Sequence, residues 1–110
     1  MAAVNARDVE RFAATFNYPT VRIASGAISV IQDAEQGRSR WDFSRIDPEW
    51  HHTLWDERRV IQRSEAKAHV AVRFTRYRAD GSSIATYESL YIMSREEGHW
   101  GIQGRSSFAP

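Results

Sequence analysis

The spacing of hydrophobic residues near the N-terminus is that of a helix with one apolar face. The residues that recur at helical spacing are Val9, Phe12, Ala13 and Phe16. This stripe predicts a helix over residues 5–17, which ends at Tyr18-Pro19 because a residue before proline is disfavoured in the α region. Short alternating segments at 21–23 and 27–31 then predict a small hairpin that turns at Ser25-Gly26.

The middle of the chain is polar and then rich in tryptophan. Residues 32–40 predict a short helical turn and a loop, and three of the four tryptophans follow between positions 41 and 55. Asp47-Pro48 is typical of a helix start, with aspartate as the N-cap and proline in the first turn. We therefore predict a second helix over residues 48–54, which would place Trp50 and Leu54 on one face.

The C-terminal half alternates between apolar and polar residues at the period of a strand. The predicted strands cover residues 56–64, 68–77, 84–93 and 100–108. Asp80-Gly81 predicts a tight hairpin, because both residues tolerate the positive φ that such turns need. The order of elements therefore indicates an α+β fold in which helices pack on an antiparallel meander.

Composition narrows the class of protein. The 110 residues are 42% hydrophobic and 26% charged, which suits one globular domain and leaves too little chain for a second core. Cysteine is absent, so disulfides, thiol catalysis and thiolate metal sites are excluded. No apolar run approaches the ~18 residues of a membrane span, and the N-terminal residues lack the features of a secretory signal. We expect a cytoplasmic protein that does not bind membranes.

The charge pattern argues against nucleic acid as a partner. The chain has 15 basic and 14 acidic residues, which gives a net charge of +1. The arginines are interspersed with Asp and Glu and form no basic block, which a nucleic-acid-binding surface requires.

Two sequence motifs resemble a known superfamily. The segment Ala2-Ala3-Val4-Asn5-Ala6-Arg7-Asp8-Val9, followed by Phe12 and Phe16, is similar to a helix boundary of the nuclear transport factor 2-like superfamily. Gly98-His99-Trp100-Gly101-Ile102 is similar to the entry to its last strand. That superfamily includes SnoaL-like (polyketide-cyclase-like) and ketosteroid-isomerase-like proteins.

The resemblance implies a strongly curved antiparallel sheet wrapped on helices, a cone-shaped α+β barrel also called a cystatin-like roll. Residues 1–110 would form one such domain, lacking most of the family's first helix. In enzymes of the family the open end of the cone holds a small molecule. The resemblance, together with an apolar sheet face, also implies a homodimer.

The catalytic set of the ketosteroid-isomerase-like proteins is not matched. The resemblance would place its base aspartate near Ile23 or Ala24 and its oxyanion-hole aspartate near Ser89, and its tyrosine would lie on the missing helix. None of these positions carries a carboxylate, so steroid isomerisation is not expected.

Alternation along the strands predicts two different sheet faces. We expect an apolar face with Val70, Val72, Phe74, Ile84, Leu90, Ile92, Trp100, Ile102 and Phe108. We expect the opposite face to carry His69, Arg73, Tyr87, Ser89, Tyr91, Gln103 and Arg105. If the polar face is concave, its arginines could hold a carboxylate or enolate oxygen and its tyrosines could donate hydrogen bonds. The alternative is that this face is the solvated or dimer-facing outside of the sheet.

These residues lead to a functional hypothesis with stated alternatives. We predict a small-molecule-binding domain whose pocket takes a partly apolar ligand, with candidate ligand-binding residues His52, His69, Arg73, Tyr87, Tyr91, Gln103 and Arg105. His52 is included because imidazole suits a general base at the mouth of the cavity. Glu49, His52 and Asp56 have the spacing of a metal site on a helix, but a solvated helix face is the preferred interpretation, so no metal and no cofactor are expected. The alternatives are a metal-independent SnoaL-like enzyme (isomerase, cyclase, dehydratase or hydrolase) and a dimerisation module without a ligand.

Overall fold

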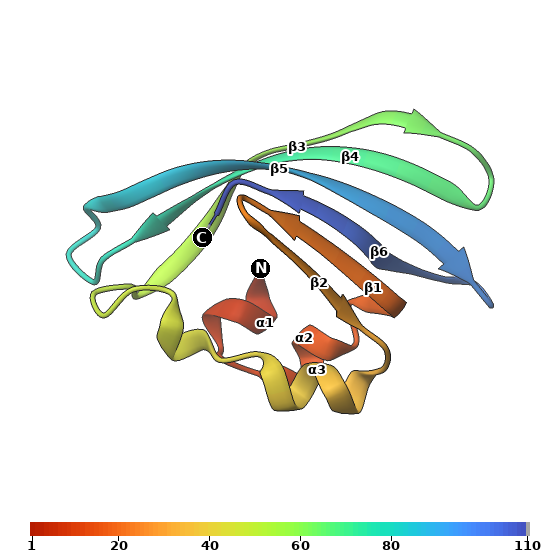
Figure 1. Ribbon diagram of the computed structural model, residues 1–110. Helices are drawn as coiled ribbons and strands as arrows, with labels where there is room; N and C mark the ends of the chain where they lie inside the picture. The colour runs from red at the N-terminus through yellow and green to blue at the C-terminus, as the bar shows by residue number, and fades with distance from the viewer. Residues whose placement is uncertain (110) are drawn as a thin grey trace.

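A curved sheet of six strands arches over three short helices and a long loop (Figure 1). The computed structural model describes residues 1–109. The helices are α1 (Ala2–Asn5), α2 (Val9–Ala13) and α3 (Ala34–Arg40), with a 3-10 turn at Phe43–Arg45. The strands are β1 (Phe16–Ala24), β2 (Ala27–Ile31), β3 (His52–Arg63), β4 (Lys67–Tyr77), β5 (Ser83–Glu96) and β6 (His99–Ser107). They lie side by side in the order β2-β1-β6-β5-β4-β3.

The sheet is mixed rather than wholly antiparallel. Four of its pairings are antiparallel, as the hairpin signals predict, but β1 runs parallel to β6. This pairing joins the first and the last strand of the chain, so no turn sequence between them predicts it. The α+β class and the curved sheet wrapped on helices are as predicted.

The predicted helix over residues 5–17 is wrong in its bounds: α2 (Val9–Ala13) is the helix within that range, and α1 (Ala2–Asn5) precedes it. Arg7 has φ 54° and breaks the helical path between α1 and α2. Asp8 then caps α2, because its side chain accepts a hydrogen bond of 3.1 Å from the backbone N–H of Arg11. The helix ends at Ala13, and Phe16 already belongs to β1.

The predicted helix over residues 48–54 does not form. The carboxylate of Asp47 accepts a hydrogen bond from the backbone N–H of Glu49 at 2.8 Å, which makes a turn, and the chain enters β3 at His52. From there the backbone pairs with β4, where Trp55 lies opposite Phe74. A full ladder of sheet hydrogen bonds outweighs the local helix signal of aspartate followed by proline.

The expected division into a polar and an apolar sheet face is wrong. Phe74 lies opposite Tyr87 and Val70 lies opposite Tyr91, so these side chains share one face. That face is the concave one, since Met1 of the N-terminal segment packs against the core cluster of Val72, Phe74 and Ala109. The residues that alternate with them face the convex side: His69, Ala71, Arg73, Leu90 and Ile92. Alternation shows which residues of one strand share a face. Only the register between strands shows which residues of neighbouring strands lie on that same face of the sheet.

Candidate functional site

Two adjoining hollows lie between the concave face and the helices. The inner hollow, of about 130 Å³, is lined by Met1, Val4, Phe12, Phe43, Ile46, Thr53, Phe74, Arg76, Tyr91 and Arg105. The outer hollow, of about 390 Å³, is lined by Phe12, Arg22, Ser29, Ile31, Arg40, Trp41, Asp42, Phe43, Arg45, Ile46 and Arg105. Phe12, Phe43, Ile46 and Arg105 belong to both and form their common wall. Together the hollows have the size and the mainly apolar lining of a small-molecule site.

Aromatic rings from four segments build the apolar part of this wall. The ring of Phe12 lies edge-on to Trp41, with centroids 4.8 Å apart, and to Phe43, with centroids 5.4 Å apart. Trp41 also stacks on Phe16 at 4.9 Å. Its indole fits there because Gly37 has no side chain; a Cβ on Gly37 would lie 2.6 Å from the ring. α3 thus holds Trp41 against the mouth of the hollows.

Three half-buried arginines contribute charge on the concave face of the site, whereas Arg40 and Arg45, which also line the outer hollow, are exposed. One row of paired positions crosses the sheet as Ser29, Arg22, Arg105, Tyr91, Val70 and Val60, and this register places Arg22 beside Arg105. The Nη2 of Arg22 donates to the carbonyl of Ala109 at 2.7 Å. The guanidinium of Arg105 lies over the ring of Phe16 at 5.0 Å. Arg76 lies over Tyr87 at 5.0 Å.

Burial changes the acid–base properties of these groups. Withdrawal from water lowers the pKa of Arg105 to about 10, and the neighbouring charge of Arg22 adds to the effect. Burial also lowers the pKa of Arg76 and raises the pKa of Tyr91. At neutral pH the site therefore presents charged guanidinium groups and a protonated phenol, all of them hydrogen-bond donors.

The loop between α3 and β3 closes the hollows on the side away from the sheet. It carries Phe43 and Ile46, which line them, and it ends at the buried Trp50. The indole N–H of Trp50 donates to the hydroxyl of Thr53 at 2.9 Å, and Arg7 lies over its ring at 4.1 Å. These contacts tie the loop to the connection between α1 and α2 and to β3.

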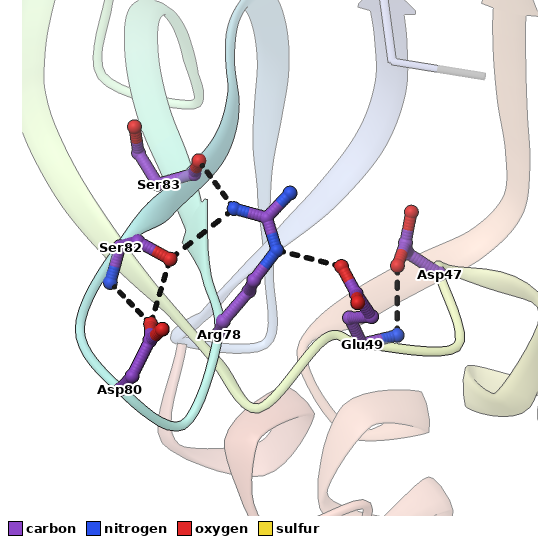
Figure 2. A network of polar contacts seen from close by, with 6 residues as sticks. All are labelled: Asp47, Glu49, Arg78, Asp80, Ser82 and Ser83. Atoms are coloured by element: carbon purple, nitrogen blue, oxygen red, sulfur yellow. Dashed lines mark hydrogen bonds and ion pairs between the residues drawn. The ribbon is translucent and has the colours of Figure 1, made fainter.

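A second attachment joins this loop to the β4–β5 hairpin. Arg78 donates from Nε to Glu49 at 2.7 Å and from Nη1 to the carbonyl of Ser83 at 3.0 Å (Figure 2). The carboxylate of Asp80 accepts from the backbone N–H of Ser82, which shapes the turn. The hairpin predicted from Asp80-Gly81 therefore also helps to hold the loop that covers the hollows.

The structure separates the candidate residues predicted from the sequence. Tyr87, Tyr91 and Arg105 lie on the concave face, where Tyr91 and Arg105 line the inner hollow. Arg73 lies on the convex face and pairs with Glu57 at 3.4 Å. His69, also on the convex face, lies 2.7 Å from Gln62.

His52 and Gln103 lie outside the hollows as well. His52 stacks on Tyr77, with ring centroids 5.1 Å apart. Gln103 occupies a bulge of β6, where its amide donates to the carbonyl of Pro19 and its oxygen accepts from Ser94. Both side chains have structural partners of their own. Within residues 1–109 no three His, Asp or Glu side chains are placed to hold a metal ion, so Glu49, His52 and Asp56 form no such group.

Two arginines of the site were missed by the sequence analysis. Arg76 follows Phe74 by two positions, so the alternation of β4 already puts it on the same face. Arg22 is the central residue of the short alternating segment 21–23. The face of the sheet on which it lies could not be known without the parallel pairing to β6. The lining residues Phe43 and Ile46 come from a loop, for which no periodicity exists.

The matching family model decides what kind of protein this is. Residues 1–107 match the family described as NTF2-like protein (DUF6841). The chain belongs to this family. No functionally curated protein matches it. No helix within residues 1–109 is long and apolar enough to cross a membrane.

Solved structures agree with this family membership at the level of the fold. A cystatin-like protein of unknown function from Nostoc punctiforme is 14% identical, with a TM-score of 0.78 over 99% of this chain and 81% of that one. An NTF2-like protein with a cystatin-like fold from Novosphingobium aromaticivorans is 9% identical, with a TM-score of 0.74 over 98% and 73%. A ketosteroid isomerase-like protein from Erwinia carotovora atroseptica is 19% identical, with a TM-score of 0.68 over 99% and 88%.

Proposed function

We propose that this NTF2-like protein binds a small organic molecule in the hollows beneath its curved sheet. The observation that carries the proposal is the common wall of Phe12, Phe43, Ile46 and Arg105, which lines both hollows. Aromatic and aliphatic surface gives the binding energy in such sites, and a few polar groups fix the orientation. Here Thr53 and Tyr91 supply neutral polar groups next to the arginine.

The lining favours binding over proton-transfer catalysis. Among the described residues the inner hollow has no Asp, Glu or His, and Asp42 is the one carboxylate of the outer hollow. The Asp42 carboxylate accepts from the hydroxyl of Ser44 at 2.6 Å and lies 3.7 Å from Nε of Arg45, and both contacts favour its charged form. A general base needs a free acceptor within reach of the substrate.

An NMR titration tests this proposal. We expect benzoate, its neutral amide benzamide, or both, to shift the indole N–H signal of Trp41 and the backbone amides around Phe43 and Ile46. Ile46→Trp should abolish these shifts, because the larger side chain fills the common wall. The matched control is Ile61→Trp, at an exposed position of β3. If neither probe perturbs the cavity signals at millimolar concentration, the proposed function is wrong.

We also propose that two copies of the chain associate through one half of the convex face. Two rows of paired residues there are largely apolar on β2, β1, β6 and β5: Ile28, Ile23, Ser106 and Leu90 in one, and Val30, Val21, Gly104 and Ile92 in the other. Ile23, Ile28 and Phe108 have 52%, 74% and 69% of their surface exposed. An apolar patch of this kind is typical of a protein–protein interface.

The opposite half of the convex face is charged. Glu57 and Arg73 pair across β3 and β4, and Arg59 lies 3.9 Å from Glu57. A polar border beside an apolar centre gives an interface its register. A second copy related by a two-fold axis would place apolar half against apolar half.

A further inference from the structure

The arginines of this protein fall into two groups according to their partners. Six have a carboxylate within 4.0 Å: Arg38, Arg45, Arg59, Arg73, Arg78 and Arg95. Among the arginines that have none within residues 1–109, only Arg22, Arg76 and Arg105 are withdrawn from solvent. All three lie on the concave face and line the hollows.

Burying a positive charge without a counter-charge opposes folding. The penalty amounts to several kcal/mol per ion even after relaxation. Stacking on Phe16 and on Tyr87 offsets part of it for Arg105 and Arg76, because a guanidinium is attracted to an aromatic face. Stacking leaves the N–H groups at the edge of the guanidinium without partners.

Those N–H groups are in fact unpaired within the described chain. Neither Arg76 nor Arg105 donates a hydrogen bond to any of residues 1–109, and Nε of Arg105 is fully buried. Buried polar atoms nearly always have a partner in native proteins. The terminal Nη groups of Arg105, unlike its Nε, are not buried, so an acceptor that carries negative charge could pair with them and would also satisfy the field of the three arginines.

We propose that the ligand is an organic anion whose carboxylate is bound by Arg105 together with Arg22 or Arg76. This inference rests on the proposed function and names the chemical class of its ligand. The planar guanidinium matches a carboxylate with two parallel hydrogen bonds, and the Tyr91 hydroxyl is a further donor. The apolar or aromatic body of the ligand packs against Phe12, Phe43 and Ile46.

Affinities for benzoate, benzamide and inorganic phosphate test the inference on the unmodified protein. We expect benzoate to bind at least about tenfold more tightly than benzamide, since a charge-assisted hydrogen bond contributes more than a neutral one. Phosphate, which has no apolar body, should bind more weakly than benzoate. Equal affinities for benzoate and benzamide at the cavity would leave the proposed function intact but would contradict the inference that the ligand is an anion. If phosphate binds as tightly as benzoate, the inference that the ligand has an apolar body is wrong.

Arg105→Met and Arg73→Met form a matched pair of variants. Both replace a half-buried arginine on the sheet, but Arg73 faces the convex side and pairs with Glu57. Arg105→Met should weaken benzoate binding at least about tenfold while melting at the same temperature or higher, because an unpaired charge is removed. Arg73→Met should not change benzoate affinity. If Arg105→Met does not fold, the double variant Arg22→Met/Arg76→Met takes its place in the comparison, and unchanged benzoate affinity in the folded variant that is tested would overturn the inference.

Discussion

Gly101 and Asn17 set the position of β1 against β6, and with it the charge of the site. The buried Asn17 donates to the carbonyl of Ser94 at 2.8 Å and accepts at 2.9 Å from the ring of His99, if Nδ1 carries the proton. A Cβ on Gly101 would lie 2.6 Å from the Asn17 oxygen and 2.7 Å from its backbone nitrogen. The absence of a side chain at residue 101 therefore allows the approach of β1, further along which Arg22 lies beside Arg105.

Gly101→Ala should destabilise the protein by about 1–3 kcal/mol, because a backbone atom and a hydrogen-bonded side chain must both shift. The measurement is the free energy of unfolding from urea denaturation. Gly104→Ala is the control on the same strand: its added Cβ would meet Ile92 at 3.5 Å, an ordinary contact. Equal losses in the two variants would show that the contact with Asn17 does not limit the packing.

Benzoate binding should not change between about pH 6 and pH 9. The pKa of Arg105 is lowered to about 10, so its guanidinium keeps its charge below that value and loses it as the pH rises through it. Burial raises the pKa of Tyr91, so the phenol stays a donor over the same range. Calorimetric titrations at several pH values check this. A step in affinity between pH 6 and 7 would instead identify a histidine, such as His52, as part of the site.

At the scale of elements, the strands could be predicted and their mutual register could not. Alternation located β4, β5 and β6, and Asp80-Gly81 located the β4–β5 turn. The face on which Tyr91 and Arg105 meet depends on pairings between strands far apart in sequence, which periodicity within one strand does not contain. Three of the seven candidate residues therefore lie on the concave face, while Arg22 and Arg76 were missed.

The loop between α3 and β3 shows a local signal overridden by packing. Asp47-Pro48 indicates a helix, but the buried Trp50 and the pairing of β3 with β4 fix an irregular path. Tertiary contacts determine the path of such a segment, because the helix propensity of a few residues contributes less free energy than the burial of one aromatic ring.

Trp50→Ala should lower the free energy of unfolding by about 3–5 kcal/mol, through loss of a buried ring and of its hydrogen bond to Thr53. Thermal and urea denaturation measure the loss. Trp100→Ala is the comparison, since this half-buried residue lies beside Met93 and Val60, far from the loop. A smaller loss for Trp50 than for Trp100 would contradict the view that Trp50 anchors the cover of the hollows.

At the scale of the whole molecule, the two faces of the sheet have different proposed roles. The concave face and the helices line the hollows, and we propose that the apolar half of the convex face contacts a second copy. The helices lie on the concave side of the sheet (Figure 1). Because the two surfaces are opposite sides of one sheet, association would leave the hollows open to a ligand.

Ile23→Lys should convert a dimer into a monomer, because it places a charge in the centre of the apolar rows. Light scattering after size-exclusion chromatography reports the mass. Val60→Lys is the control: Val60 is 54% exposed but lies in the row of the concave face. A monomeric parent protein, or a dimer that persists in Ile23→Lys, would show that the convex face is not the interface.

The central claim is that the hollows beneath the sheet bind a small organic molecule that carries a carboxylate, and a crystal structure of the protein grown with benzoate tests it most directly. The account predicts the ring between Phe12, Phe43 and Ile46, with the carboxylate oxygens within hydrogen-bond distance of Arg105. Benzoate found only on the convex face, or hollows that stay free of it at saturating concentration, would contradict the account.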